Sequence, residues 1–372
     1  MPSHILIIPD KFKGTLTAPA AAQAIADGWR QARPHDALEL LPMSDGGDGF
    51  GELVGCLLGA SAQTVRTVDA AGRVVAARWW WEPKTKTAVI ESAGIIGLAM
   101  LPPGKFHPFE LDTFGLGAVL RAASAKGARR CLIGIGGSAT NDGGFGLARA
   151  LGWKFFNRAG KELTRWTELH TLAKVRPPPR KRWFKQLIVA VDVQNPLLGQ
   201  RGATRVYGPQ KGLRPDDLPA AEKNLRRLAR VMSPDRAGFQ TQPGAGAAGG
   251  LGFGLLAFLG AQGESGFDLF ARHAKLAKRL RAADWVVTGE GRVDASTLMG
   301  KGVGEIARQC RTLKIPCIAL AGVIANRDQV LRRFARAHGL TDLTSVAKAQ
   351  TKPARWLQKL TRHVAQNFAG CD

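Results

Sequence analysis

Cysteine is scarce in this sequence, and its spacing is irregular. The five cysteines are Cys56, Cys131, Cys310, Cys317 and Cys371, and no two of them form a Cys-x-x-Cys pair. An odd number of scattered cysteines argues against a disulfide framework and against a structural zinc site, since such sites place cysteines in close pairs. We therefore expect a protein of a reducing compartment.

Long apolar runs are also missing. No segment reaches the ~18 consecutive apolar residues that cross a bilayer, and residues 251–261, which come nearest, are rich in glycine. The apolar run that follows Met1 is too short for a secretory signal peptide. The sequence predicts a cytoplasmic protein with no membrane partner.

Acidic residues are outnumbered: 29 Asp and Glu stand against 53 Lys and Arg, which gives a formal net charge of +24. Such an excess suggests a nucleic-acid-binding protein. The excess is mostly arginine scattered along the whole length, however, and no zinc-finger, RNA-recognition or helix-turn-helix pattern accompanies it. We favour a solvated basic surface that attracts small anionic substrates. A nucleic-acid-binding protein remains the less favoured alternative.

Standard nucleotide-binding signatures are missing too. Gly300-Lys301 lacks the upstream glycine of a Walker loop, and the Gly-x-Gly-x-x-Gly at residues 244–249 follows no predicted strand. Residues 134–139 match the looser Gly-x-Gly-x-x-Ala, but without the acidic residue expected about 20 residues later. The histidines all lie outside the glycine-rich segments. A nicotinamide-dependent oxidoreductase of a small hydroxy acid that uses residues 134–139 stays open as an alternative.

What the chain does contain is an alternation of short apolar runs and amphipathic stretches. Its 372 residues suggest two domains, and the alternation predicts an α/β fold with a mostly parallel sheet. The predicted strands are residues 5–8, 38–41, 131–135, 187–191, 285–288, 317–321 and 343–346. The predicted helices are residues 18–31, 50–58, 113–126, 147–153, 220–232, 267–282, 303–313, 329–338 and 354–368.

One region breaks this alternation. Residues 65–68, 74–81 and 87–91 are rich in β-forming side chains and are separated by turn sequences, which predicts an antiparallel meander. Alternation along the strand should bury some of the tryptophans in Trp79-Trp80-Trp81. We expect a discontinuous first domain of residues 1–62 and 283–372. A second domain of residues 63–282 would carry the meander and a glycine-rich loop.

That glycine-rich loop, residues 134–146, is the most informative segment. It lies between a predicted buried strand and a predicted helix. Glycines let the backbone approach a ligand closely, and the N–H groups at a helix start favour an anion. The alternative is a tight turn in which Asn141 or Asp142 caps the helix.

Similar clusters, rich in glycine or in polar and charged residues, recur after other predicted strands. They lie at residues 8–15, 44–49, 191–196 and 288–294, with two more at 207–212 and 243–252. Open α/β sheets bind their ligands beyond the carboxyl ends of the strands. The clusters together therefore predict one site that gathers phosphate oxygens, a divalent metal and a polar substrate, as phosphoryl transfer requires.

In these segments the sequence strongly resembles the bacterial glycerate kinase family of the glycerate 2-kinase type. The matching segments run in the family's order over nearly the whole chain: 9–14, 45–49, 134–144, 192–196, 208–212, 243–252 and 288–294. The resemblance implies two α/β domains, one flavodoxin-like with a parallel sheet and one mixed-sheet domain like restriction endonucleases, with the active site in the cleft between them. It implies ATP and Mg²⁺ as cofactors and D-glycerate as substrate, with 2-phosphoglycerate favoured over 3-phosphoglycerate. A homo-oligomer stays open.

The resemblance and the charged residues of the clusters together predict roles for individual side chains. The base that deprotonates the glycerate hydroxyl is Asp192 or Asp294, with Asp192 preferred, and Lys13 and Arg292 complete the catalytic group. The predicted substrate-binding residues are Asp10, Lys13, Asp45, Lys211 and Arg292. The predicted nucleotide-binding residues are Gly136, Gly137, Ser138, Thr140, Asn141, Asp142, Gly143 and Gly144. The predicted magnesium ligands are Asp45, Asp48 and Glu290.

Overall fold

The chain forms two compact units. The computed structural model describes residues 2–12, 14–232, 238–294, 297 and 302–368. The first unit, here called the terminal unit, consists of Met1–Asp45 and Phe267–Asp372, and the central unit consists of Gly46–Gly266. These bounds differ from the domain bounds expected from the sequence, 1–62 with 283–372 and 63–282. Helix α2 (Phe50–Leu58) groups with the central unit, and helix α10 (Leu276–Ala282) with the terminal unit.

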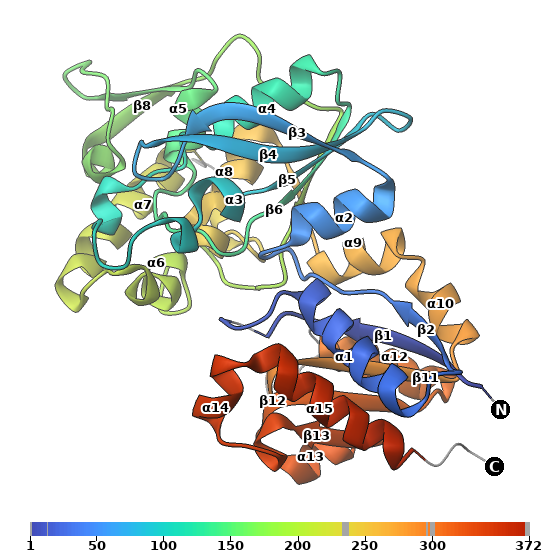
Figure 1. The fold of residues 1–372 in the computed structure, drawn as a ribbon. Helices are drawn as coiled ribbons and strands as arrows, with labels where there is room; N and C mark the ends of the chain where they lie inside the picture. The colour runs from blue at the N-terminus through green and yellow to red at the C-terminus, as the bar shows by residue number, and fades with distance from the viewer. Residues whose placement is uncertain (1, 13, 233–237, 295–296, 298–301, 369–372) are drawn as a thin grey trace. The chain divides into compact units, whose positions relative to one another are not determined.

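The terminal unit contains a five-stranded, fully parallel sheet (Figure 1). Its strands are β1 (His4–Pro9), β2 (Ala37–Leu40), β11 (Trp285–Val293), β12 (Cys317–Ile324) and β13 (Arg336–Gly339), in the order β13-β12-β11-β1-β2. Counted along this unit, the order is 2-1-3-4-5, which is the order of flavodoxin-like folds. The expected parallel, flavodoxin-like sheet is therefore confirmed.

Helices cover both faces of this sheet. Helices α1 (Ala18–Ala32) and α15 (Pro353–Gln366) lie side by side over Ile5 and Ile7 (Figure 1). Side chains alternate along a strand, so Leu6 and Ile8 point to the opposite face, where α10 contacts β1 and α12 (Val303–Leu313) contacts β11. The remaining helices of this unit are α9 (Gly266–His273), α13 (Arg327–Leu331), α14 (Val346–Thr351) and the 3₁₀ turn η7 (Leu340–Asp342).

Three predictions for the terminal unit are wrong. Residues 329–338, expected as one helix, form the end of α13 and the strand β13, and the strand expected at residues 343–346 is absent from the described structure there. Strand β13 shows no apolar alternation, since Ala337 is its only apolar side chain. It forms a strand because it pairs with β12. Pairing of this kind overrides local propensity. The helix expected at 267–282 is broken at Lys275, whose φ of 51° is left-handed.

The central unit contains a six-stranded mixed sheet. Its strands are β3 (Ser61–Val68), β4 (Val74–Glu82), β5 (Thr87–Glu91), β6 (Arg130–Gly134), β9 (Gln186–Ala190) and β10 (Gln262–Glu264), in the order β10-β9-β6-β5-β4-β3. The antiparallel meander β3–β4–β5 is confirmed. Strands β5, β6, β9 and β10 are parallel to one another. The sequence did not predict a separate hairpin, β7 (Lys154–Asn157) with β8 (Leu172–Arg176).

The meander tryptophans pack on opposite faces of the central sheet. Trp80 sits against α2, where a Cβ on either Gly51 or Gly55 would overlap its ring. Trp79 faces the other way and joins the main core with Leu120 of α4 (Leu116–Ala125). Both tryptophans are buried, as strand alternation predicted, and α2 can lie flat on the sheet only because two of its residues are glycine.

The other helices of the central unit surround this sheet and the hairpin. They are α3 (Ala93–Ile96), α5 (Phe145–Ala150), α6 (Ala203–Tyr207), α7 (Leu218–Met232) and α8 (Ala247–Leu259), with 3₁₀ turns η1 (Leu98–Met100), η2 (Pro108–Glu110), η3 (Trp166–Thr171), η4 (Pro209–Lys211), η5 (Pro215–Asp217) and η6 (Phe239–Thr241). Helix α8 was not predicted from the sequence. Its first turn is interrupted by left-handed residues at 248–250, in a glycine-rich segment that resembles a loop. Among the described helices, none is long and apolar enough to cross a membrane.

Candidate active site

The parallel strands of the central unit bring polar groups to one edge of the sheet. Strands β5, β6, β9 and β10 run in the same direction, so their carboxyl ends meet at the same edge. Glu91 ends β5, the loop 134–144 follows β6, Asp192 follows β9, and Ser265 follows β10. This edge is the candidate site of the central unit.

The glycine-rich segments of this unit pack against one another, backbone against backbone. A Cβ on Gly136 would lie 2.6 Å from Cα of Gly47, and one on Gly254 would lie 2.7 Å from Cα of Gly144. A Cβ on Gly249 would overlap the carbonyl oxygen of Thr140. Only glycine permits these approaches, so the recurrence of glycine in the sequence has a structural cause as well as a proposed functional one.

Asp142 is buried, and its carboxylate caps the helix that follows the loop. Its oxygens accept hydrogen bonds from the backbone N–H groups of Thr113, Gly144 and Gly146 and from the Thr113 hydroxyl. Burial raises the pKa of Asp142, and these hydrogen bonds oppose the rise. These contacts are the ones expected from the alternative prediction, a tight turn in which Asp142 caps the helix. Thr113, which the sequence analysis missed, also accepts from the Leu147 N–H at 2.9 Å.

Other amides of the loop are also engaged within the protein. Gly136 donates its N–H to the Gly46 carbonyl at 3.1 Å, and Gly143 donates to the Gly249 carbonyl at 3.1 Å. Helix α5 has only six residues, and the amides of Gly144 and Gly146 in its first turn point at Asp142. In the first half of the loop, Ala139 likewise donates its N–H to the Ile96 carbonyl at 2.8 Å, and of residues 137–144 only Gly137 is exposed.

Lys211 in η4 holds that first half in place. Its Nζ donates to the Ser138 hydroxyl at 2.9 Å and to the Thr140 carbonyl at 2.6 Å. Burial lowers the pKa of Lys211 to about 7, although the nearby carboxylate of Asp142 works in the opposite direction. The predicted substrate-binding lysine is thus buried under the glycine-rich loop.

Two buried polar atoms in the same segment are unsatisfied. Asn141 donates from Nδ2 to the Thr204 hydroxyl at 3.1 Å. Its Oδ1 and the Thr140 hydroxyl, by contrast, have no hydrogen-bond partner within the described residues. A buried polar atom without a partner costs about 1–3 kcal/mol, so a native structure usually offers a reason for it. A polar ligand or ordered water at this loop would supply one.

Asp192 is held in one orientation at the carboxyl end of strand β9. Its Oδ1 accepts from the Ser265 hydroxyl at 2.8 Å and from the Gly266 N–H at 3.0 Å. Ser265 was not predicted, because strand β10, which places it, has only three residues. Asp48 lies against the loop, since a Cβ on Gly137 would overlap Oδ1 of Asp48. Glu91, also missed, caps α2 by accepting from the N–H groups of Gly49 and Gly51.

The terminal unit holds a second group of predicted site residues at the carboxyl ends of β1 and β11. Asp10 follows β1, and its N–H donates to the Gly289 carbonyl at 2.8 Å. Burial raises the pKa of Asp10 to about 7, and repulsion from Asp45 and Glu290 adds to the rise. Burial likewise raises the pKa of Glu290 to about 7, with smaller contributions from Asp294 and Asp45. These carboxylates lie close enough to repel one another.

Strand β11 carries the remaining residues of this group. The sequence analysis placed residues 289–293 in a loop, but they continue the strand, and Arg292 pairs in register with Val323. Arg292 forms an ion pair with Asp294, with 3.1 Å between Nε and Oδ2. Thr297, which was not predicted, donates its hydroxyl to Glu290 Oε1 at 2.7 Å. Lys13 lies outside the described residues.

The predicted magnesium ligands do not form a complete protein cage. Asp45 and Glu290 belong to the terminal unit, and Asp48 belongs to the central unit. In the parts of the chain that the structure describes, no three Asp, Glu, His or Cys side chains converge as a metal site. The predicted position of the active site between the two domains stays a prediction.

Comparisons with known proteins agree over most of the chain. The family described as "Glycerate kinase family" matches residues 5–369. A glycerate kinase of Halalkalibacterium halodurans is 38% identical over 323 residues, which cover 86% of this chain and 85% of the relative. A glycerate 2-kinase of Escherichia coli is 35% identical over 346 residues, covering 92% and 90%. The crystal structure of a putative glycerate kinase 2 from Salmonella typhimurium LT2 superposes with a TM-score of 0.80 at 31% identity, over 99% of this chain and 98% of that one.

Proposed function

This chain belongs to the glycerate kinase family, and from that premise we propose a course for its reaction. Membership makes it a kinase that uses ATP to phosphorylate glycerate. We propose that the acceptor is D-glycerate and that the product is 2-phosphoglycerate, in line with the name of the Escherichia coli relative. The nicotinamide-dependent alternative is set aside, because the matching family model and the named relatives above are glycerate kinases.

Asp192 is the proposed base. It would accept the proton of the glycerate hydroxyl while that oxygen attacks the γ-phosphorus of ATP and ADP leaves. The observation that carries this assignment is the pair of hydrogen bonds from Ser265 and Gly266 to Oδ1. They orient the carboxylate at the edge of the sheet where the glycine-rich loops converge. Asp294, the other candidate, is engaged by the Arg292 guanidinium, which favours an orienting role for it.

The first half of the loop is the proposed phosphate-binding segment. Lys211 donates hydrogen bonds to Ser138 and Thr140, and Gly137 is left-handed with a φ of 77°. The backbone conformation of the segment is therefore fixed. The unsatisfied atoms of Thr140 and Asn141 support a polar ligand here. Gly143, Gly144 and Asp142 would act indirectly, by keeping the turn closed, rather than by touching phosphate.

Magnesium is the proposed counter-ion of ATP. The carboxylate oxygens of the terminal unit are the type of ligand that Mg²⁺ prefers. Mg²⁺ takes oxygen ligands and usually keeps several waters, binding through one or two carboxylates together with substrate phosphates. It therefore needs no three-ligand protein cage. Asp45 and Glu290 would hold it, with Asp48 as a further candidate, and the raised pKa of Glu290 marks a charge that a cation would stabilise. The ion would neutralise charge on the transferring phosphoryl group.

Arg292 and Lys13 are proposed to bind the glycerate carboxylate or the transferring phosphoryl group, with Asp10 as a hydrogen-bond partner of the substrate. Arginine suits this role because its planar fork matches carboxylate and phosphate oxygens. A cytoplasmic location, a possible oligomer and the lack of a nucleic-acid partner stay predictions from the sequence.

The test is ADP release by the full chain with D-glycerate, L-glycerate and other small hydroxy acids, followed by phosphorus NMR of the product. We expect turnover with D-glycerate and a single resonance of 2-phosphoglycerate. Release of ADP with another hydroxy acid in preference to D-glycerate would overturn the substrate assignment. A 3-phosphoglycerate resonance would overturn only the position of phosphorylation.

A further inference from the structure

Helix α7 presents a stripe of cations to a cavity in the central unit. The cavity has a volume of about 610 Å³, and Lys223, Arg226, Arg227 and Arg230 line one side of it. Their spacing of i, i+3, i+4 and i+7 places them on one face of the helix. The opposite face is buried through residues such as Leu225 and Leu228, so the helix is fixed with its cationic face outward.

The facing wall comes from segments that are distant in sequence. Arg158 follows β7, and His170 lies near the end of η3. Helix α7 packs against both η3 and β8. Among the lining residues, all of them in the described structure, none is acidic. None of them is a predicted active-site residue either, so the cavity is separate from the site proposed above.

The walls of this cavity are held in place by hydrogen bonds. Asn224 is buried, and its Oδ1 accepts from the His170 N–H at 2.7 Å, which ties η3 to α7. The Arg227 guanidinium donates to the Leu172 carbonyl. A site whose walls are already ordered loses little entropy when a ligand binds.

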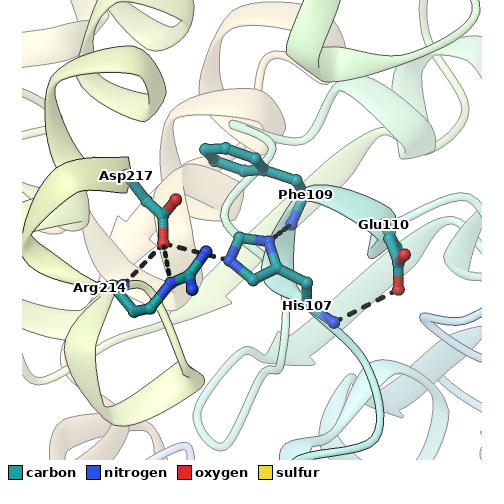
Figure 2. Close-up of polar contacts among 5 residues, drawn as sticks. All are labelled: His107, Phe109, Glu110, Arg214 and Asp217. Carbon is teal, nitrogen blue, oxygen red and sulfur yellow. Dashed lines mark hydrogen bonds and ion pairs between the residues drawn. The ribbon is translucent and has the colours of Figure 1, made fainter.

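The start of α7 is anchored as well. Figure 2 shows Asp217, the last residue of η5, accepting from the N–H of Arg214 at 2.8 Å and bonding to His107 Nε2 at 3.1 Å. His107 belongs to the segment that begins η2, and its Nδ1 accepts from the Phe109 N–H at 3.3 Å. The helix therefore cannot easily turn its cationic face away from the cavity.

Stability of the helix does not explain the cations. Lys223 with Arg227, and Arg226 with Arg230, are like-charge pairs four residues apart, which destabilise a helix slightly. Arg226 has a partner in Glu222, at 3.6 Å. Lys223 and Arg230 make no ion pair with any other described residue. Their charges are left for an external anion.

We propose that this cavity binds a small molecule that carries two or more phosphoryl groups. Guanidinium groups match phosphate oxygens in pairs, and the volume lies within the range of about 300–1,000 Å³ typical of small-molecule sites. Lys223 and Arg230 are about 10 Å apart along the helix axis, a spacing that suits two separated phosphates better than one. The proposal does not depend on the function proposed for the active site.

The test measures binding of inorganic tripolyphosphate to the full chain by isothermal titration calorimetry. Two doubly substituted proteins are compared with the unaltered one: Lys223→Gln with Arg230→Gln, and, as a control of equal charge, Arg66→Gln with Lys185→Gln. Arg66 and Lys185 are exposed and lie outside the cavity. We expect the cavity substitutions to weaken binding at least about tenfold, and the control substitutions to leave it within about twofold.

Two further readouts separate the proposal from loss of folding and from loss of the active site. The cavity variant should unfold at the same temperature as the control variant without ligand, and should lose the stabilisation that tripolyphosphate gives the unaltered protein. Its turnover with ATP and D-glycerate should be unchanged. Equal binding by all three proteins, equal weakening in both variants, or no binding at all would overturn the proposal. A different pattern would also overturn it: the unaltered protein binds a single-stranded RNA, the cavity variant does not, and tripolyphosphate binds neither. That pattern would identify a nucleic-acid-binding surface.

Discussion

The buried ammonium group of Lys211 donates a hydrogen bond to the carbonyl oxygen of Thr140, with 2.6 Å between Nζ and oxygen. The two residues are 71 positions apart in the chain, and the contact ties the turn η4 to the glycine-rich loop. Burying a lysine is costly, and the lowered pKa of Lys211 reflects that cost. The contact therefore implies that the shape of the loop matters to the protein.

Replacing Lys211 tests whether it shapes the loop or binds glycerate directly. Lys211→Met removes the donor to Ser138 and Thr140 while keeping a long apolar side chain. We expect kcat/KM for ATP to fall about 10- to 1,000-fold, with KM for D-glycerate within about threefold of normal. Ser138→Ala, which removes one of the two acceptors, should have a smaller effect on ATP. A rise confined to the KM for glycerate would show instead that Lys211 contacts that substrate.

Asp192→Asn tests the proposed base. Asparagine keeps an acceptor for Ser265 and Gly266 but cannot take a proton, so kcat should fall at least roughly 100-fold while the protein remains folded. Ser265→Ala removes only the orienting hydroxyl and should cost less than about tenfold. Initial rates at saturating ATP and D-glycerate measure both. If Asp192→Asn turns over at a near-normal rate, the base is another residue, and Asp294→Asn is the next variant to measure.

Asp142→Asn tests the capping role. The carboxylate accepts from four donors, and an asparagine amide would turn an NH₂ group toward some of them. We expect the free energy of unfolding to fall by about 2–4 kcal/mol, because buried donors lose a charged acceptor. Urea denaturation measures the loss. Asp216→Asn, an exposed substitution in the same unit, should change stability by less than about 0.5 kcal/mol, and equal effects of the two would refute the capping role.

Asp112 predicts how stability depends on pH. Burial and, secondarily, the charge of Asp142 raise the pKa of Asp112 to about 6, above the value near 4 of an unfolded chain. Between these values the folded protein binds more protons than the unfolded chain, so this group lowers stability as pH rises from about 4 to 6. The penalty is complete above pH 6.

Asp112→Asn removes that titration while keeping an acceptor for the Phe114 N–H, which now bonds at 2.9 Å. The variant should therefore gain stability relative to the unaltered protein between pH 4.5 and pH 7.5, by about 2 kcal/mol. Urea denaturation at both pH values gives the comparison. A difference between the two proteins that is the same at both pH values would show that Asp112 titrates normally.

Much of the fold could be predicted because the pattern of burial is local. Helices α2 and α12 have the predicted bounds, 50–58 and 303–313, since each shows an apolar face at helical spacing. Strand β13 could not be predicted, because Arg336–Gly339 has little apolar pattern and is a strand through pairing with β12. Helix α8 was hidden by its glycines, which disfavour a helix locally and are needed where Gly249 and Gly250 pass close to the loop 134–144.

The candidate site divides in the same way. The sequence by itself determined the family, the chemical types available and the edge of the sheet where they gather, because these depend on the order of strands and on the residues that follow them. Only the tertiary structure decided which partners each group has and how deeply it is buried. Asp142 caps a turn because Thr113 and two amides donate to it, Lys211 is buried and bonded to the loop, and Asp192 is oriented by Ser265, which follows a strand too short to recognise. Hydrogen-bond partners that are far apart in the chain meet only after folding, so no pattern of neighbouring residues can reveal which polar groups are already satisfied and which remain for a ligand.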